Sequence, residues 1–167
     1  MDYDGKDQYH GHGFQIHVGP MKPQSRGTVE LSPRNPNGSP IIRFNYNESP
    51  RDREVMRRGI RIARQIIGQT AFGSYRGDEL RPGLATKSDE ELDAFVREYS
   101  ESAYHPSCTC RMGLDKDAVV NQRGEVNGVS GLRIVDASIM PEITNGNLNA
   151  AVIMMAEKIS DMIKQVS

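Results

Sequence analysis

The 167-residue sequence has no tryptophan, no long apolar run and almost no net charge. No stretch approaches the roughly 18 apolar residues that a membrane-spanning helix needs, and no apolar signal-peptide region follows Met1. Its 21 basic and 22 acidic residues give a net charge of −1. The composition therefore provides no electrostatic case for binding nucleic acid or an anionic membrane surface. The length suits one ordinary domain with a core, or part of a larger one.

Cysteine is also scarce, and its two copies, Cys108 and Cys110, are separated by one residue. A disulfide across so short a gap is strained, which favours a reduced intracellular pair. Structural zinc needs four ligands and no second ligand cluster follows, so we predict no metal site. His10 and His12 lie in a polar, glycine-rich stretch, residues 1–13, which we expect to be a flexible lead-in.

Alternating apolar residues predict three short strands in the first part of the chain. The alternation comprises Phe14, Ile16 and Val18, then Val29 and Leu31, then Ile42, Phe44 and Tyr46. The intervening segments, 19–27 and 32–40, are rich in Gly, Pro, Ser and Asn, as connections are. Three short strands joined in this way favour an antiparallel sheet.

Two helices are predicted next. Ser49 and Pro50 suit the cap and first turn of a helix, and Ser88 with Glu91 forms a capping box at the start of another. Their apolar stripes comprise Val55, Met56, Ile60, Ala63, Ile66 and Ile67 in the first, and Leu92, Phe95, Val96 and Tyr99 in the second. The segment between them, 72–86, has no periodicity and is expected to be a surface loop.

The first of these helices also carries a basic face, formed by Arg53, Arg57, Arg58, Arg61 and Arg64. Such a face could bind an anion. We favour a solvated helix face with acidic neighbours, because charged runs on amphipathic helices usually have that role.

The end of the chain predicts a strand, a sharp turn and a helix. Residues 132–135 form a short apolar strand that ends at Asp136, and the last helix is expected from about 147 to 164. Its buried stripe comprises Leu148, Val152, Met155, Ile159, Met162 and Ile163. Gly146 permits close approach of the backbone, and helix N-terminal amides can hold negative charge. The predicted architecture is α+β.

Two motifs in this second half carry the functional signal. His105 lies in the segment 104–113, Tyr-His-Pro-Ser-Cys-Thr-Cys-Arg-Met-Gly. Asn149 follows it by 44 residues, in the segment 146–150, Gly-Asn-Leu-Asn-Ala, which comes shortly after Val-Asp-Ala-Ser-Ile-Met-Pro at 135–141. Taken with residues 13–21 and 88–97, these motifs resemble the C-terminal portion of the glucose-methanol-choline (GMC) oxidoreductase family.

The resemblance implies a two-part architecture. Residues 14–131 would form the substrate-binding domain, an antiparallel sheet backed by helices. Residues 132–167 would return to a Rossmann-like FAD domain, adding one strand to its sheet and laying the last helix against the flavin. The Gly-x-Gly-x-x-Gly fingerprint that anchors the cofactor's pyrophosphate is not in the sequence, since Gly124, Gly128 and Gly131 have the wrong spacing. We therefore expect the C-terminal part of a longer enzyme, inactive without its N-terminal FAD-binding domain.

The resemblance also assigns roles to individual residues. His105 matches the family's active-site histidine, the base that takes the hydroxyl proton of an alcohol, and Asn149 matches its partner, a donor to the developing alkoxide. The positions that fall in flavin-contacting segments are Asp136, Ala137, Asn147 and Ala150. The expected cofactor is FAD.

Within the family, the resemblance points to members that oxidise choline, giving betaine aldehyde. Tyr104 adjoins His105 and could place an aromatic face against a quaternary ammonium. The resemblance further favours a respiratory electron acceptor and peripheral association with a bacterial or mitochondrial inner membrane. Two alternatives remain open: a different alcohol substrate within the family, and a non-catalytic binding module that retains the fold.

Overall fold

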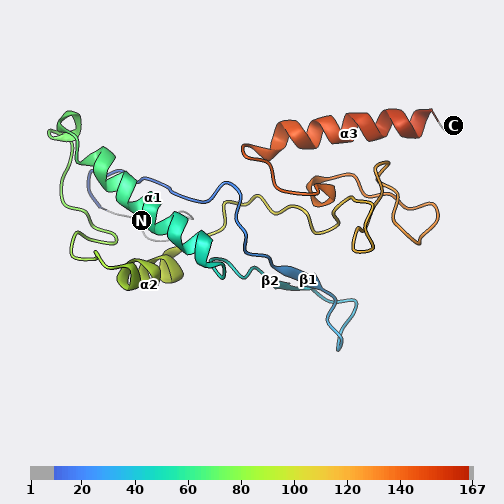
Figure 1. Ribbon diagram of the computed structural model, residues 1–167, viewed down its shortest axis with the longest axis horizontal. Helices are drawn as coiled ribbons and strands as arrows, with labels where there is room; N and C mark the ends of the chain where they lie inside the picture. Colours follow the sequence, from blue (N-terminus) through green and yellow to red (C-terminus); the bar gives the residue numbers. More distant parts are fainter. Residues whose placement is uncertain (1–9, 166–167) are drawn as a thin grey trace. The chain divides into compact units, whose positions relative to one another are not determined.

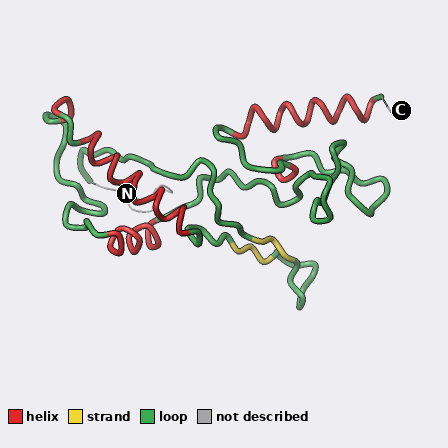
Figure 2. The backbone as a smooth tube through the Cα atoms, viewed as in Figure 1, coloured by secondary structure: helices red, strands yellow, loops and turns green. Residues whose placement is uncertain are grey.

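The computed structural model describes residues 10–165, so most of the predicted lead-in, residues 1–9, lies outside the described part. Its α+β content, which the sequence predicts, is shown in Figures 1 and 2. The elements are β1 (Thr28–Glu30), β2 (Ile41–Arg43), α1 (Pro50–Ile67), the short 3-10 helix η1 (Thr70–Phe72), α2 (Asp89–Tyr99), the 3-10 helix η2 (Ala137–Ile139) and α3 (Leu148–Lys164).

The described chain forms two compact units. The first comprises residues 10–26 and 45–102, and the second comprises residues 27–44 and 103–165. This division follows contacts in space within the chain. The boundaries expected at residues 13 and 131 concern the domains of a longer enzyme, and they stay predictions.

In the first unit, α1 and α2 pack against one another and enclose a small apolar core (Figure 1). The core is built by Ile60 of α1 with Leu92 and Val96 of α2. The capping box predicted at the start of α2 is confirmed: Ser88 Oγ accepts from Glu91 N at 3.1 Å, and Ser88 N donates to Glu91 Oε2 at 2.9 Å. The segment after η1, residues 73–86, is the predicted irregular loop.

The apolar stripe predicted on α1 is only partly correct. Ile60 is buried and Met56 packs against the core, whereas Val55 and Ile66 are exposed on the chain as described. The helix that packs against α1 has 11 residues, whereas α1 has 18. A short partner covers a narrow strip, so the edges of the stripe stay outside.

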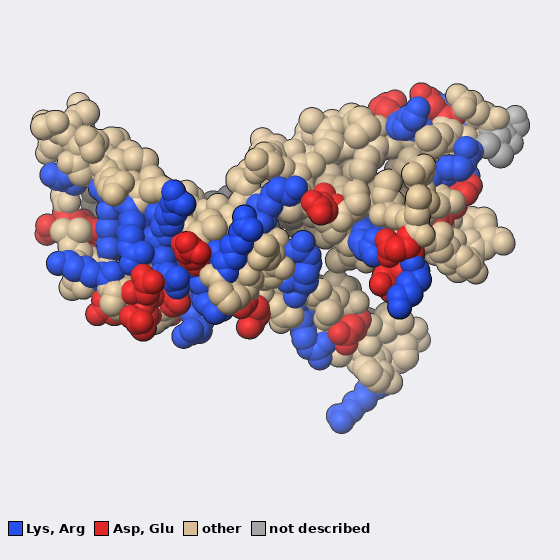
Figure 3. Space-filling model, viewed as in Figure 1, with Lys and Arg blue, Asp and Glu red and all other residues tan. Residues whose placement is uncertain are grey.

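The basic face of α1 meets acidic side chains from α2 and from the loop that precedes it. Arg57 lies 2.8 Å from Asp93, Arg61 lies 2.6 Å from Asp89, and Arg64 binds Glu79 through Nε and NH2. Figure 3 shows a group of basic side chains (blue) bordered by acidic ones (red) on this part of the molecule. The acidic neighbours are as predicted, but Arg57 and Arg64 are half-buried against them rather than solvated. This charge matching removes the case for an anion site on that face.

The start of α1 is fastened to the preceding loop by a buried carboxylate. Asp52 is 2% exposed, and its oxygens accept hydrogen bonds from Gln24 N at 2.8 Å, Ser25 N at 2.7 Å and Ser25 Oγ at 2.5 Å. Burial alone would raise the pKa of Asp52, but the hydrogen bonds from Ser25 and Gln24 outweigh it, and the pKa lies below its ordinary value. The ionised carboxylate is therefore part of the folded unit.

We expect Asp52→Asn to lower the free energy of unfolding by about 1–3 kcal/mol at pH 7, because an amide nitrogen would face the donors of Ser25 or Gln24. Since folding depresses this pKa, the stabilisation is complete above the unfolded-state value of about 4 and is lost as pH falls through the lowered folded-state value. Urea unfolding at pH 7 and near pH 3 measures both effects. Glu54→Gln, an exposed acid of the same helix, is the control. Equal losses in the two variants would contradict the role of Asp52.

The second unit contains the only paired strands of the described chain. β1 and β2 are antiparallel, with Val29 opposite Ile42. The strand predicted at residues 14–18 is wrong, and so is the one at 132–135, where an isolated bridge joins Glu125 and Arg133. Each has the apolar pattern of a strand, but residues 14–18 have no strand assignment, and within the described chain residues 132–134 bond only to the short turn at 124–126, through Val126 N to Leu132 O and Ile134 N to Gly124 O.

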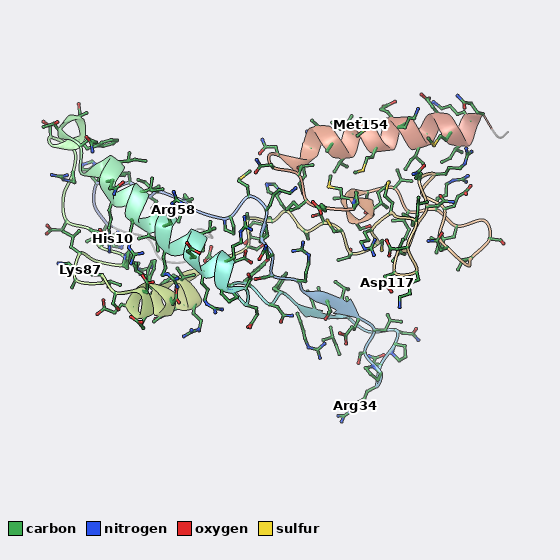
Figure 4. The ribbon with its side chains drawn as sticks, in the orientation of Figure 1. His10, Arg34, Arg58, Lys87, Asp117 and Met154 are labelled. Atoms are coloured by element: carbon green, nitrogen blue, oxygen red, sulfur yellow. The ribbon has the colours of Figure 1, made fainter. Side chains whose placement is uncertain are left out.

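Between the hairpin and α3, the second unit is mostly loop (Figure 2). These loops are held by an apolar core in which Val120, Ile139 and Ile159 are at most 2% exposed. The last helix is confirmed, and Leu148 and Ile159 of its predicted stripe are buried. Ile163 is exposed, as is Met154, which Figure 4 labels on α3.

Candidate functional site

All of the residues predicted to form the site lie in the second unit. His105 is on an exposed loop, and the backbone of this loop is left-handed at Tyr104, with φ 57°, and at Cys108, with φ 68°. A bulky residue seldom adopts positive φ, and such conformations persist where surrounding contacts impose them. The two turns therefore fix the path of the backbone on both sides of His105.

The segment that follows His105 is bonded to the turn that begins at Asp136. The amides of Cys108, Cys110 and Met112 donate to the carbonyls of Ala137, Ser138 and Ile139 at 3.2, 2.9 and 2.9 Å. Alternate residues of one segment thus bond to successive residues of η2. This ladder brings together two of the three predicted motifs, which lie about thirty residues apart in the sequence.

The third motif opens α3. Asn147 is the N-cap residue and its side chain makes no capping hydrogen bond. Leu148 is buried, whereas Asn149 and Ala150 of the first turn are exposed. Because Leu148 is held in the core, the side chains on either side of it point out of the core. The first amides of the helix and the Asn149 amide group are therefore available to a ligand.

One apolar core connects the first two motifs with α3, the helix that the third motif opens. Met112 follows the His105 loop, Ile139 belongs to η2, and Met155 and Ile159 belong to α3, and all four pack in the cluster around Val120. A shift of any of these segments would open the core, at a cost of about 25 cal/mol for each Å² of apolar surface exposed. The site segments are thus parts of one packed unit.

The two proposed active-site residues are not held by side-chain hydrogen bonds in this unit. Neither His105 nor Asn149 has a side-chain hydrogen bond to another residue of the described part of the chain. Tyr104 is 65% exposed. Asp136 is exposed, and its Oδ1 accepts from Ser138 N at 2.7 Å, so its carboxylate caps its own turn. The roles predicted for these residues stay predictions.

Sequence reasoning missed two features of the site, of which only the second has a sequence signal. The left-handed conformations of Tyr104 and Cys108 have no sequence signal, because glycine is the residue that usually marks positive φ. The backbone role of Ser138 could have been found, since Asp-Ala-Ser at 136–138 is the pattern of an Asp side chain bonding the amide two residues on.

A hollow in the same unit lies apart from these motifs. It is lined by Asn121 and residues 125–133, and it is open to solvent. None of its lining residues belongs to the three motifs, so it does not bear on the predicted chemistry.

The start of α3 offers groups that suit a flavin. Uncapped amides and the helix dipole favour partial negative charge, and a Cβ at Gly146 would meet no atom within 4 Å. Residues 146–150 could thus approach a planar ring closely. Among residues 10–165 there is no group of three or more His, Cys, Asp and Glu side chains that could hold a metal ion. No described helix is long and apolar enough to cross a membrane.

Comparison with known proteins gives a consistent result. The family model of the GMC oxidoreductases matches residues 23–156. The chain is 54% identical over 164 residues to an oxygen-dependent choline dehydrogenase of Ectopseudomonas mendocina and 53% identical to that of Yersinia pestis. Each match covers 98% of this chain and 29% of the relative, so the chain spans less than a third of the relatives' length.

Solved structures agree with this similarity. Pyridoxine 4-oxidase from Mesorbium loti superposes with a TM-score of 0.80 at 36% identity, covering 87% of this chain and 28% of that one. An FAD-dependent oxidoreductase from Chaetomium thermophilum gives a TM-score of 0.78 at 33% identity, covering 89% and 26%. The resemblance inferred from the motifs is confirmed at the level of family and fold.

Proposed function

The chain belongs to the GMC oxidoreductase family, and from that premise we propose that it is the C-terminal part of a longer FAD-dependent dehydrogenase that oxidises choline to betaine aldehyde. The observation that carries the proposal is the ladder between residues 108–112 and 137–139, together with the apolar core that Met112 and Ile139 share with Met155 and Ile159 of α3. The 54% identity to a choline dehydrogenase supports the choice of substrate.

His105 is the base in this proposal. Oxidation of an alcohol removes a proton from oxygen and a hydride from the adjoining carbon, and a ring nitrogen of His105 takes the proton. Free imidazole titrates near pH 6.5, so a histidine can accept a proton at neutral pH and release it to solvent. Its exposed loop in this chain leaves the ring accessible to a substrate.

Asn149 stabilises the charge that develops on the substrate oxygen. Its side-chain amide donates a hydrogen bond without titrating, as a preorganised donor does. The backbone of α3 fixes its position, because Leu148 before it is buried.

The FAD-binding role of this chain is partial. Asn147 and Ala150 at the start of α3 and Ala137 in η2 would contact the flavin, whereas the pyrophosphate would be held by a domain outside this sequence. When bound, FAD supplies the acceptor of the hydride. In the proposed enzyme, residues 132–167 belong to the FAD domain and residues 14–131 to the substrate domain.

Tyr104 provides the recognition of the choline cation. Its ring is 65% exposed and adjoins the proposed base, so one substrate molecule can reach both residues. A quaternary ammonium within about 6 Å of an aromatic ring gains roughly 0.5–2 kcal/mol. We also propose a respiratory electron acceptor and peripheral association with an inner membrane, on the basis of the family resemblance.

A different alcohol is the second candidate, because structural neighbours at 33–36% identity include pyridoxine 4-oxidase and a fungal aryl-alcohol oxidase. The test compares choline with 3,3-dimethylbutan-1-ol, which has the same shape without the charge. We expect kcat/KM for choline to exceed that for the neutral alcohol by tenfold or more in the longer enzyme, and Tyr104→Leu to shrink the difference. Equal kcat/KM values would contradict the proposed cation site and would favour another alcohol as the substrate.

A further inference from the structure

The carboxylate of Asp136 is directed into its own turn. Its Oδ1 accepts from Ser138 N at 2.7 Å, while the Asp136 carbonyl accepts from Ile139 N at 3.2 Å. Together with the bond from Met140 N to Ala137 O at 3.3 Å, these two bonds close η2, which has only three residues. In so short an element, the Asp136 carboxylate is the one side chain of the described chain that bonds to the backbone of the turn.

Those carbonyls hold the His105 loop at its downstream end. Cys108 is the first residue of the ladder and donates to Ala137 O, and it is also the residue at which the loop turns left-handed. Only Pro106 and Ser107 separate it from His105. The direction in which the loop leaves η2 therefore decides where the imidazole lies.

We propose that Asp136 is a positioning residue for His105, acting through η2 and the ladder rather than through contact with the flavin. This inference rests on the proposed function, in which His105 is the base. The family resemblance predicts a flavin contact at position 136, which stays a prediction; in the structure, Oδ1 of Asp136 accepts from Ser138 N.

Substitutions at position 136 can distinguish the effect of the hydrogen-bonding oxygen from the effect of the negative charge. Asparagine keeps an oxygen in the position of Oδ1 and caps a turn about as well as aspartate, whereas alanine removes the cap. In the longer enzyme, we expect Asp136→Ala to slow flavin reduction by choline at least tenfold with flavin content and choline affinity unchanged. We expect Asp136→Asn to stay within about twofold of the unmodified enzyme. Asp117→Ala, which changes an exposed aspartate of the same unit (Figure 4), is the matched control.

Hydrogen exchange tests the link between Asp136 and the ladder independently of catalysis. Hydrogen exchange of the peptide that contains Cys108, Cys110 and Met112 should accelerate about threefold to thirtyfold in Asp136→Ala and stay unchanged in Asp136→Asn, since loss of a cap makes local opening more frequent. Loss of flavin from both variants, or unchanged exchange in Asp136→Ala, would overturn the proposal. If the alanine variant does not fold, Asp136→Asn still tests the proposal. An inactive Asp136→Asn enzyme would contradict the positioning role.

The same experiments distinguish this inference from the proposed function. His105→Ala could keep normal turnover while exchange in the ladder accelerates in Asp136→Ala. That result would contradict the role of His105 as the base and would support the link between Asp136 and the ladder. If His105→Ala is inactive and exchange in Asp136→Ala is unchanged, the base stands and the positioning role has failed.

Discussion

Replacing His105 with alanine should reduce flavin reduction by choline about 10²- to 10⁴-fold in the longer enzyme, with flavin still bound. General-base catalysis by a positioned side chain contributes that range, which corresponds to roughly 3–5 kcal/mol of activation free energy. Flavin should remain bound because His105 lies on an exposed loop outside the core formed by Val120, Ile139 and Ile159. Stopped-flow measurement of flavin absorbance at saturating choline gives the rate directly.

The pH dependence of this rate provides a further check. The pH–rate profile of His105→Ala should differ in shape from that of the unmodified enzyme, because the variant has no side chain at position 105 that can exchange a proton. His12→Ala is the control, because His12 is also exposed but belongs to the first unit. Turnover close to normal in His105→Ala would remove this residue from the mechanism.

The sequence predicts well those elements whose stabilising contacts are local. The capping box at Ser88 and Glu91 is formed as expected, and α3 begins within one residue of its predicted start. The strand predictions at 14–18 and 132–135 were wrong for the opposite reason. A strand needs a continuous ladder of backbone hydrogen bonds to a neighbouring strand, whereas residues 132–135 make only an isolated bridge to Glu125 and residues 14–18 have no strand assignment.

The site shows the same division between local and distant contacts. The motifs around His105 and Asn149 identify the family, but the pattern of residues could not reveal that Cys110 and Met112 bond to the carbonyls of η2. Those bonds are made by the backbone, which carries no side-chain signature. The basic face of α1 is similar: the sequence shows the arginines, while the pairing of Arg57 with Asp93 depends on the packing of α2.

Asn149→Ala is the second change from which we expect a large loss. Removing one preorganised donor to a developing oxyanion typically costs about 10²- to 10³-fold in rate, roughly 3–4 kcal/mol. The fold should be unaffected, because Asn149 is exposed and α3 is held by Leu148 and Ile159. We expect the loss in the rate of flavin reduction, with the dissociation constant of choline changed only severalfold.

The separation of rate from affinity decides the role of Asn149. Loss of a donor that acts on the transition state lowers kcat, whereas loss of a group that only holds the substrate raises KM. Asn145→Ala, an exposed asparagine in the loop before α3, is the matched control and should be close to normal in both. An effect of Asn149→Ala confined to KM would refute the proposed role. If both residues act on the same oxygen, the double variant His105→Ala, Asn149→Ala should lose less than the product of the two single losses, because groups that act as a unit are not additive.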